Sequence, residues 1–107
     1  MKYGLKDETI ALMQTVFSCF PEVEKAILYG SRAKGNFKPN SDIDISLIGK
    51  ALNLDILNQI EWKLDDLLLP YKIDLSILQY LKNDELIKKI QEAGIVLFIK
   101  SQNKVVN

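Results

Sequence analysis

One stretch organises the chain: Ala26-Ile27-Leu28-Tyr29-Gly30-Ser31-Arg32-Ala33-Lys34-Gly35, followed after a short polar loop by Ser41-Asp42-Ile43-Asp44-Ile45. The apolar start predicts a buried strand over 24–29, so Gly30 and Ser31 stand where a strand ends and a helix begins. Backbone N–H groups without partners converge at such a junction, together with the positive end of the helix dipole. The junction therefore suits a phosphate.

Carboxylates follow on two further predicted strands. Apolar and polar residues alternate over 42–48, which places Asp42 and Asp44 on one face, because side chains alternate along a strand. The same alternation over 71–78 places Asp74 on a polar face. One face of each strand is thus expected to pack, and the other is available for chemistry.

Metal-assisted chemistry is the function that these acids favour. Two acids side by side on a strand face repel each other unless water or a cation screens them. Mg²⁺ prefers carboxylates together with the oxygens of a bound triphosphate, and two ions would stabilise both the attacking and the leaving oxygen of an in-line displacement. Asp42, Asp44 and Asp74 are therefore predicted as metal ligands and catalytic residues. The third acid either completes the shell of a second ion or accepts the proton of the attacking hydroxyl.

The glycine–serine junction is predicted to hold the triphosphate. Gly30 lets the backbone approach a phosphate closely, and Ser31 offers both its hydroxyl and its N–H. Arg32 and Lys34 are expected to supply positive charge near the leaving group. The spacing matches neither a P-loop nor a dinucleotide fingerprint, so the aspartates carry the functional argument.

Composition narrows the class of protein. The chain has 107 residues, 48% of them hydrophobic, with fourteen acidic and fourteen basic side chains and no histidine. The length predicts one domain over residues 1–100, followed by a frayed tail over 101–107. The balanced charge predicts no electrostatic field that would attract nucleic acid or a membrane surface. Because no apolar run is long enough to span a membrane, a cytoplasmic location is expected. Without histidine, Ser-His and Cys-His catalysis and imidazole zinc sites are excluded. The single cysteine, Cys19, is expected to be a small buried apolar residue.

The remaining elements alternate along the chain. Helices are predicted over 5–20, ended by Pro21, over 54–68 with Asn53 as its cap, and from Asn83 to a stop at Gly94. A short apolar run over 95–99 predicts a last strand. In the second of these helices Leu54 and Leu68 are assigned to the buried side, and Trp62 to packing or an interface.

Taken together, the glycine–serine stretch, the Asp-x-Asp pair, the isolated Asp74 and the final Gly-Ile-Val-Leu at 94–97 resemble the minimal nucleotidyltransferase (MNT) domains of the DNA polymerase beta superfamily. The resemblance implies an α+β fold, a small mixed sheet of about four strands flanked by helices. It also implies that Gly30 and Ser31 hold the triphosphate, that Asp42 and Asp44 bind the metals, and that Asp74 is the third carboxylate.

Many MNT proteins are antitoxins paired with a helical HEPN toxin. The resemblance implies transfer of AMP from ATP to a tyrosine hydroxyl of that HEPN partner, which silences its ribonuclease activity. Two alternatives stay open: a binding antitoxin that only masks the partner, and a nucleotidyltransferase acting on a small molecule such as an aminoglycoside. The sequence leaves the nucleobase, the acceptor residue and the assembly, a homo-oligomer or a complex with the partner, undetermined.

Overall fold

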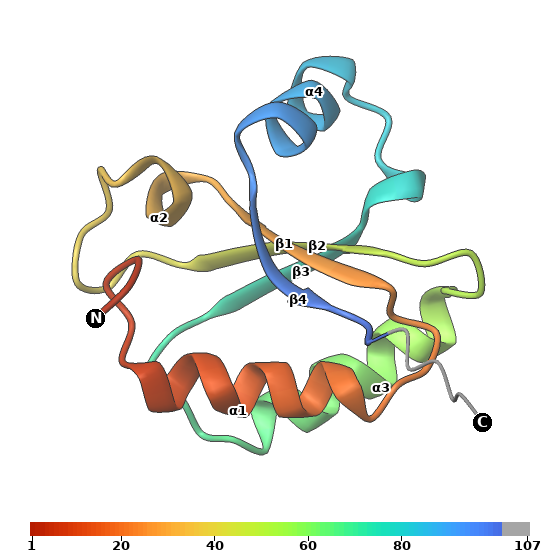
Figure 1. The fold of residues 1–107 in the computed structure, drawn as a ribbon, viewed down its shortest axis with the longest axis horizontal. Coiled ribbons are helices and arrows are strands. Elements are labelled where there is room, and N and C mark those ends of the chain that lie inside the picture. Colours follow the sequence, from red (N-terminus) through yellow and green to blue (C-terminus); the bar gives the residue numbers. More distant parts are fainter. Residues whose placement is uncertain (102–107) are drawn as a thin grey trace.

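Four strands form one sheet in the computed structural model, which describes residues 1–101 (Figure 1). The strands are β1 (Lys25–Tyr29), β2 (Ile43–Ile48), β3 (Ile73–Ile77) and β4 (Ile95–Ile99), in the spatial order β3-β2-β1-β4. β1 pairs antiparallel with β2 and with β4, whereas β2 and β3 are parallel. The predicted small mixed sheet and its α+β class are confirmed.

Helices flank both faces of this sheet (Figure 1). α1 (Asp7–Ser18) and α3 (Leu54–Asp65) lie along one face; α2 (Ser31–Lys34) and α4 (Asp84–Ala93) lie on the other, and a 3-10 turn, Leu78–Tyr80, follows β3. The Oδ1 atoms of Asn53 and Asn83 accept hydrogen bonds from Ile56 N (2.9 Å) and Leu86 N (3.1 Å). Both predicted helix caps are confirmed, because each amide oxygen satisfies a first-turn N–H.

The main core lies between the sheet and the α1–α3 layer. Ile43, Ile45 and Leu47 of β2 have no exposed surface, as their alternation predicts. Phe17 of α1 is fully buried, and its ring centroid lies 6.0 Å from that of Phe98. The opposite sheet face is covered only in part, chiefly where α4 packs on β1. That asymmetry leaves room for polar side chains on the second face.

Several expectations at the helix ends are wrong. α3 ends at Asp65, and Leu68 has a left-handed backbone (φ 53°) with 88% of its side chain exposed. Leu54 is also exposed, because it lies on the outer side of α3. Trp62 is exposed too, so it does not pack in the core, and its assignment to an interface stays a prediction. Cys19 is exposed as well, since α1 ends at Ser18 and the cysteine follows as its cap. Helical periodicity marks a face of the helix but not the residue at which the helix stops.

Two other expectations concern the tail and membranes. The predicted frayed tail, 101–107, lies outside the described residues apart from Ser101. Within residues 1–101, no helix combines the length and the apolar character that crossing a membrane requires.

The α1 core contact yields a stability prediction. Phe17→Ala should lower the free energy of unfolding by about 3–5 kcal/mol, because it removes a fully buried ring and leaves a cavity. Leu12→Ala on the same helix removes a side chain that is 45% exposed and should cost less than about 1 kcal/mol. Urea unfolding followed by circular dichroism measures both, and equal losses would contradict the placement of the core.

Candidate active site

Three polar side chains form a row across the partly covered sheet face. In the strand register Asp44 of β2 lies opposite Asp74 of β3 and opposite Tyr29 of β1. Asp42 stands one residue before β2 and is exposed, as is Asp74, while Asp44 is half-buried. The structure therefore brings acids from two separate parts of the sequence to adjacent positions.

The electrostatics of Asp44 reflect this crowding. Burial raises the pKa of Asp44 above its usual value of 3.8, and the neighbouring charges of Asp74 and Asp42 raise it further. Each of these causes penalises the ionised carboxylate. A proton or a cation beside Asp44 would relieve the penalty.

A hard divalent cation fits this donor set only in part. The side chains are carboxylates, which are the ligands that Mg²⁺ prefers. In the part of the chain that the structure describes, no three cysteine, aspartate or glutamate side chains are grouped closely enough to hold a metal ion by themselves. Mg²⁺ commonly takes one or two carboxylates and completes its shell with water and substrate phosphates. Metal binding by Asp42, Asp44 and Asp74 thus remains a prediction in which the substrate supplies further ligands.

Gly30 places the strand–helix junction directly against Asp44. Its backbone has φ 75° and ψ −153°, a conformation that is close to exclusive to glycine. A Cβ atom built on Gly30 would collide with Oδ2 of Asp44. The close approach of this turn to the carboxylate therefore requires glycine for two independent reasons.

Ser31 begins a single helical turn at this junction. The turn is closed by hydrogen bonds from Lys34 N to Gly30 O (3.1 Å) and from Gly35 N to Ser31 O (2.9 Å). The first N–H groups of a helix have no acceptor within it. Ser31, which is half-buried, directly follows the glycine that lies against Asp44.

The predicted triphosphate ligand Arg32 has its side chain in the interior of the protein. Only 1% of its side chain is exposed, and its guanidinium donates to the carbonyl oxygens of Tyr3, Pro39 and Ser41. Donors that are committed to backbone carbonyls are not free for a triphosphate. The predicted contact between Arg32 and the leaving group finds no support in this arrangement.

Three residues outside the predicted site, Tyr29, Ser46 and Ser76, extend the polar face. Burial raises the pKa of Tyr29, with smaller effects from a lowering hydrogen bond to Ser76 and from the raising charges of Asp74 and Asp44. The Ser76 hydroxyl donates to Oγ of the fully buried Ser46 (3.0 Å). Tyr29 is thus a neutral phenol beside the acids at physiological pH. Only the strand pairing reveals that Tyr29 lies beside Asp44, because alternation within one strand does not identify the neighbouring strand.

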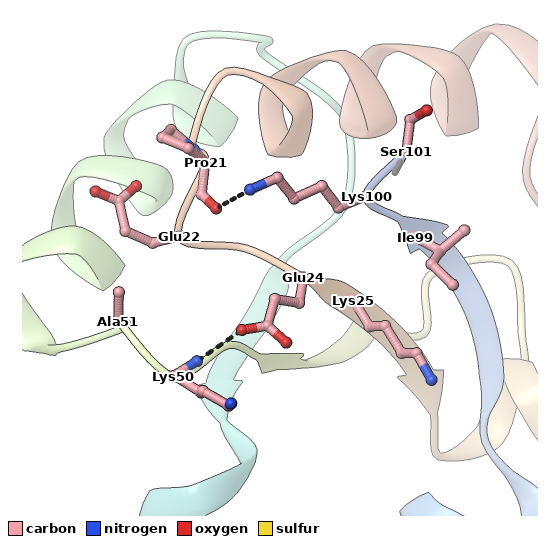
Figure 2. A pocket seen from close by; sticks show the side chains of 9 residues that line it. All are labelled: Pro21, Glu22, Glu24, Lys25, Lys50, Ala51, Ile99, Lys100 and Ser101. Atoms are coloured by element: carbon pink, nitrogen blue, oxygen red, sulfur yellow. Dashed lines mark hydrogen bonds between the residues drawn. The ribbon is translucent and has the colours of Figure 1, made fainter. Parts of the chain in front are cut away.

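A cavity of about 550 Å³ lies away from these acids, at the opposite end of β1 (Figure 2). Two smaller cavities, of about 290 and 240 Å³, lie between α3 and β3. Figure 2 shows the charged lining of the large cavity tied to the backbone: Lys100 Nζ donates to Pro21 O (3.0 Å), and Lys50 N donates to Glu24 Oε2 (3.0 Å). None of the predicted site residues lines it, so its volume says nothing about the chemistry of the acids.

Comparisons with known proteins place the chain among nucleotidyltransferases. The family model described as "Polymerase beta, Nucleotidyltransferase" matches residues 12–103. No curated protein matches the chain.

Solved structures share the fold. A toxin–antitoxin crystallised with AMP-PNP is 24% identical with a TM-score of 0.66, covering 92% of this chain and 76% of that one. A toxin–antitoxin MntA–HpeT mutant with two Asp-to-Glu substitutions is 21% identical (TM-score 0.63; coverage 92% and 75%). A predicted nucleotidyltransferase from Sulfolobus solfataricus is 19% identical (TM-score 0.55; coverage 100% and 96%).

Two glycines give a matched test of the junction. Gly30 and Gly35 both have positive φ, 75° and 88°, but only at Gly30 would a Cβ meet the Asp44 carboxylate, whereas Gly35 has open space around it. Gly30→Ala should weaken calorimetric binding of Mg²⁺-ATP on the order of tenfold or more, because it displaces Asp44. Gly35→Ala should bind as the wild type does and lose about 1 kcal/mol of stability. Equal affinity of the two variants for Mg²⁺-ATP would contradict a role of the contact between Gly30 and Asp44 in binding the nucleotide.

The raised pKa of Asp44 predicts a stability that depends on pH. In the folded state the carboxyl retains its proton to higher pH than in the unfolded chain, so its favourable contribution is present below pH 3.8 and is lost as pH rises through the folded pKa. Without divalent cations, Asp44→Asn should therefore unfold at higher urea than the wild type at pH 7. The advantage should shrink as the pH falls toward 3.8. A variant less stable than the wild type at pH 7 would show that the carboxylate is favourably paired instead.

Proposed function

The chain belongs to the polymerase beta nucleotidyltransferase family, and from this we propose that it transfers AMP from ATP to a tyrosine hydroxyl of a HEPN-domain partner, with Mg²⁺, and so acts as an antitoxin. One observation carries the proposal: Asp44 and Asp74 lie in register and the Gly30 turn lies against Asp44. A surface that merely masks a partner has no need of a crowded carboxylate with a raised pKa.

The similar structures support the choice of nucleotide and partner. One of them is a toxin–antitoxin with AMP-PNP, an analogue of ATP, and another is the toxin–antitoxin MntA–HpeT. Both cover 92% of this chain. By analogy we assign ATP as the nucleotide and a toxin as the acceptor protein.

The proposed reaction is an in-line displacement at the α-phosphorus of ATP. The acceptor oxygen bonds to phosphorus, the bond from phosphorus to the α,β-bridging oxygen breaks, and pyrophosphate leaves. Asp74 is exposed at the edge strand β3, so we assign it the proton of the attacking hydroxyl. Mg²⁺, when bound, supplies positive charge to the phosphate oxygens, and Asp42 and Asp44 are the residues that would hold it.

The strand–helix junction holds the triphosphate in this proposal. Gly30 has no side chain to obstruct a phosphate, and the N–H and hydroxyl of Ser31 donate to its oxygens. The junction adjoins Asp44, so a phosphate bound there would share a cation with that carboxylate. Binding and catalysis therefore depend on the same contact.

Transfer of radioactive label tests the proposal. The wild-type protein, incubated with ATP labelled at the α-phosphate, Mg²⁺ and its HEPN partner, should label the partner on tyrosine. Asp42→Asn/Asp44→Asn should reduce labelling on the order of a thousandfold, because the cation loses two ligands. Asp7→Asn/Glu8→Gln, which removes two exposed acids from α1 on the opposite side of the sheet, is the matched control and should label normally.

The same preparations decide between catalysis and masking. If the Asp42→Asn/Asp44→Asn variant still neutralises the ribonuclease activity of the partner, the protein acts by masking and the catalytic proposal is wrong. If a labelled aminoglycoside appears instead of a labelled partner, the acceptor assignment is wrong.

A further inference from the structure

A buried arginine fastens three separate segments beside the acids. Arg32 donates from Nη1 to Tyr3 O (2.9 Å), from Nη2 to Pro39 O (3.3 Å), and from Nε and Nη2 to Ser41 O (3.2 and 2.8 Å). The two bonds to one carbonyl use the planar fork of the guanidinium. Arg32 therefore joins α2 to the N-terminal turn and to the loop over 36–41.

Two aromatic rings complete the surroundings of this guanidinium. Its central carbon lies 5.3 Å from the ring centroid of Phe37 and 4.9 Å from that of Tyr71. Such distances place the cation within reach of the ring faces. Phe37 belongs to the loop, and Tyr71 stands three residues before Asp74, so the arrangement also reaches the segment that leads into β3.

The N-terminal turn closes over the arginine. Lys2 and Leu5 pair across a tight turn: Lys2 N donates to Leu5 O (3.1 Å) and Leu5 N donates to Lys2 O (2.8 Å). Tyr3 and Gly4 both have left-handed backbone, with φ 59° and 74°. A Cβ on Gly4 would lie 2.8 Å from Nη1 of Arg32 and would overlap the Phe37 ring. The turn is thus packed tightly enough to leave Arg32 almost no exposed surface.

These contacts meet at the residues that flank the acids. Ser41, whose carbonyl accepts two bonds from Arg32, immediately precedes Asp42. Arg32 itself follows Gly30 by two positions, and Gly30 lies against Asp44. One side chain therefore links the turn assigned to the triphosphate with the strand end assigned to the metal.

We infer that Arg32 is a positioning residue, which holds the phosphate turn and the Asp42 strand end in register for transfer without contacting the nucleotide. The effect on transfer rests on the function proposed above, whereas the effect on the loop does not. A lysine keeps the positive charge but lacks the planar fork, so it cannot reproduce the two bonds to Ser41 or the contacts with two rings.

Arg32→Lys separates positioning from direct charge. We expect kcat for labelling of the HEPN partner to fall roughly 10- to 100-fold, because a displacement of Asp42 misplaces the reacting groups. The Mg²⁺ concentration for half-maximal rate should rise, while the KM for ATP at saturating Mg²⁺ stays within about threefold. Asn40→Ala, at an exposed position of the same loop, is the matched control and should leave all three quantities unchanged.

Hydrogen exchange gives a readout that needs no catalysis. Within the loop, Lys38 N donates to Ser41 Oγ (2.8 Å) and Ser41 N donates to Lys38 O (3.0 Å). Amide exchange over 36–42 should be faster in Arg32→Lys than in the wild type and unchanged in Asn40→Ala. Unchanged exchange in Arg32→Lys overturns the inference whether or not the wild type transfers AMP.

The kinetic constants of Arg32→Lys also test whether Arg32 is a positioning residue. Wild-type kcat in Arg32→Lys, or a loss confined to the KM for ATP, overturns the inference; the second result would indicate contact with the triphosphate. If Arg32→Lys does not fold, Phe37→Leu removes one ring and should show the same pattern with a smaller loss, and wild-type behaviour there overturns the inference. A wild type that labels no partner refutes the proposed function, and the exchange measurement then decides the role of Arg32.

Discussion

The parallel pairing of β2 with β3 is the constraint on which this structure depends. Parallel neighbours need a crossover, and α3 supplies it on the face where Ile43, Ile45 and Leu47 are buried. Because α1 and α3 cover the face that carries these apolar residues, the alternate side chains of β2 and β3 point to the opposite face. Asp44 and Asp74 then lie side by side on the other face, where α4 covers only part of the sheet. The fold thus creates the carboxylate pair as a consequence of how it buries its apolar residues.

This pair is electrostatically unfavourable in the folded protein. Burial and two neighbouring charges disfavour the ionised form of Asp44, and nothing in apolar packing requires an acid there. Around it the polar face is otherwise well satisfied, since Ser46 and Ser76 bond to each other. Among the described residues, no buried side-chain nitrogen or oxygen lacks a hydrogen-bond partner. The unfavourable electrostatics are therefore concentrated at the acids, as expected where a ligand completes a site.

Sequence patterns were informative wherever the determining interactions are local. Alternation identified the faces of β2 and β3, and Asn53 and Asn83 cap their helices as their side chains predict. The hydrogen bonds of Arg32 cannot be predicted from the sequence, because its partners are backbone carbonyls from residues 3, 39 and 41, which no side-chain pattern marks. Tyr29 was overlooked because its position beside Asp44 comes from strand register.

The N-terminal turn belongs to the packed structure, although it precedes the residues that the family model matches. The family model starts at residue 12, within α1, yet Leu5 is fully buried and the Tyr3 carbonyl binds the guanidinium of Arg32. A protein trimmed to the shared family region would lose these contacts along with its first residues. The packed structural unit thus extends upstream of residue 12, where the match to the family model starts.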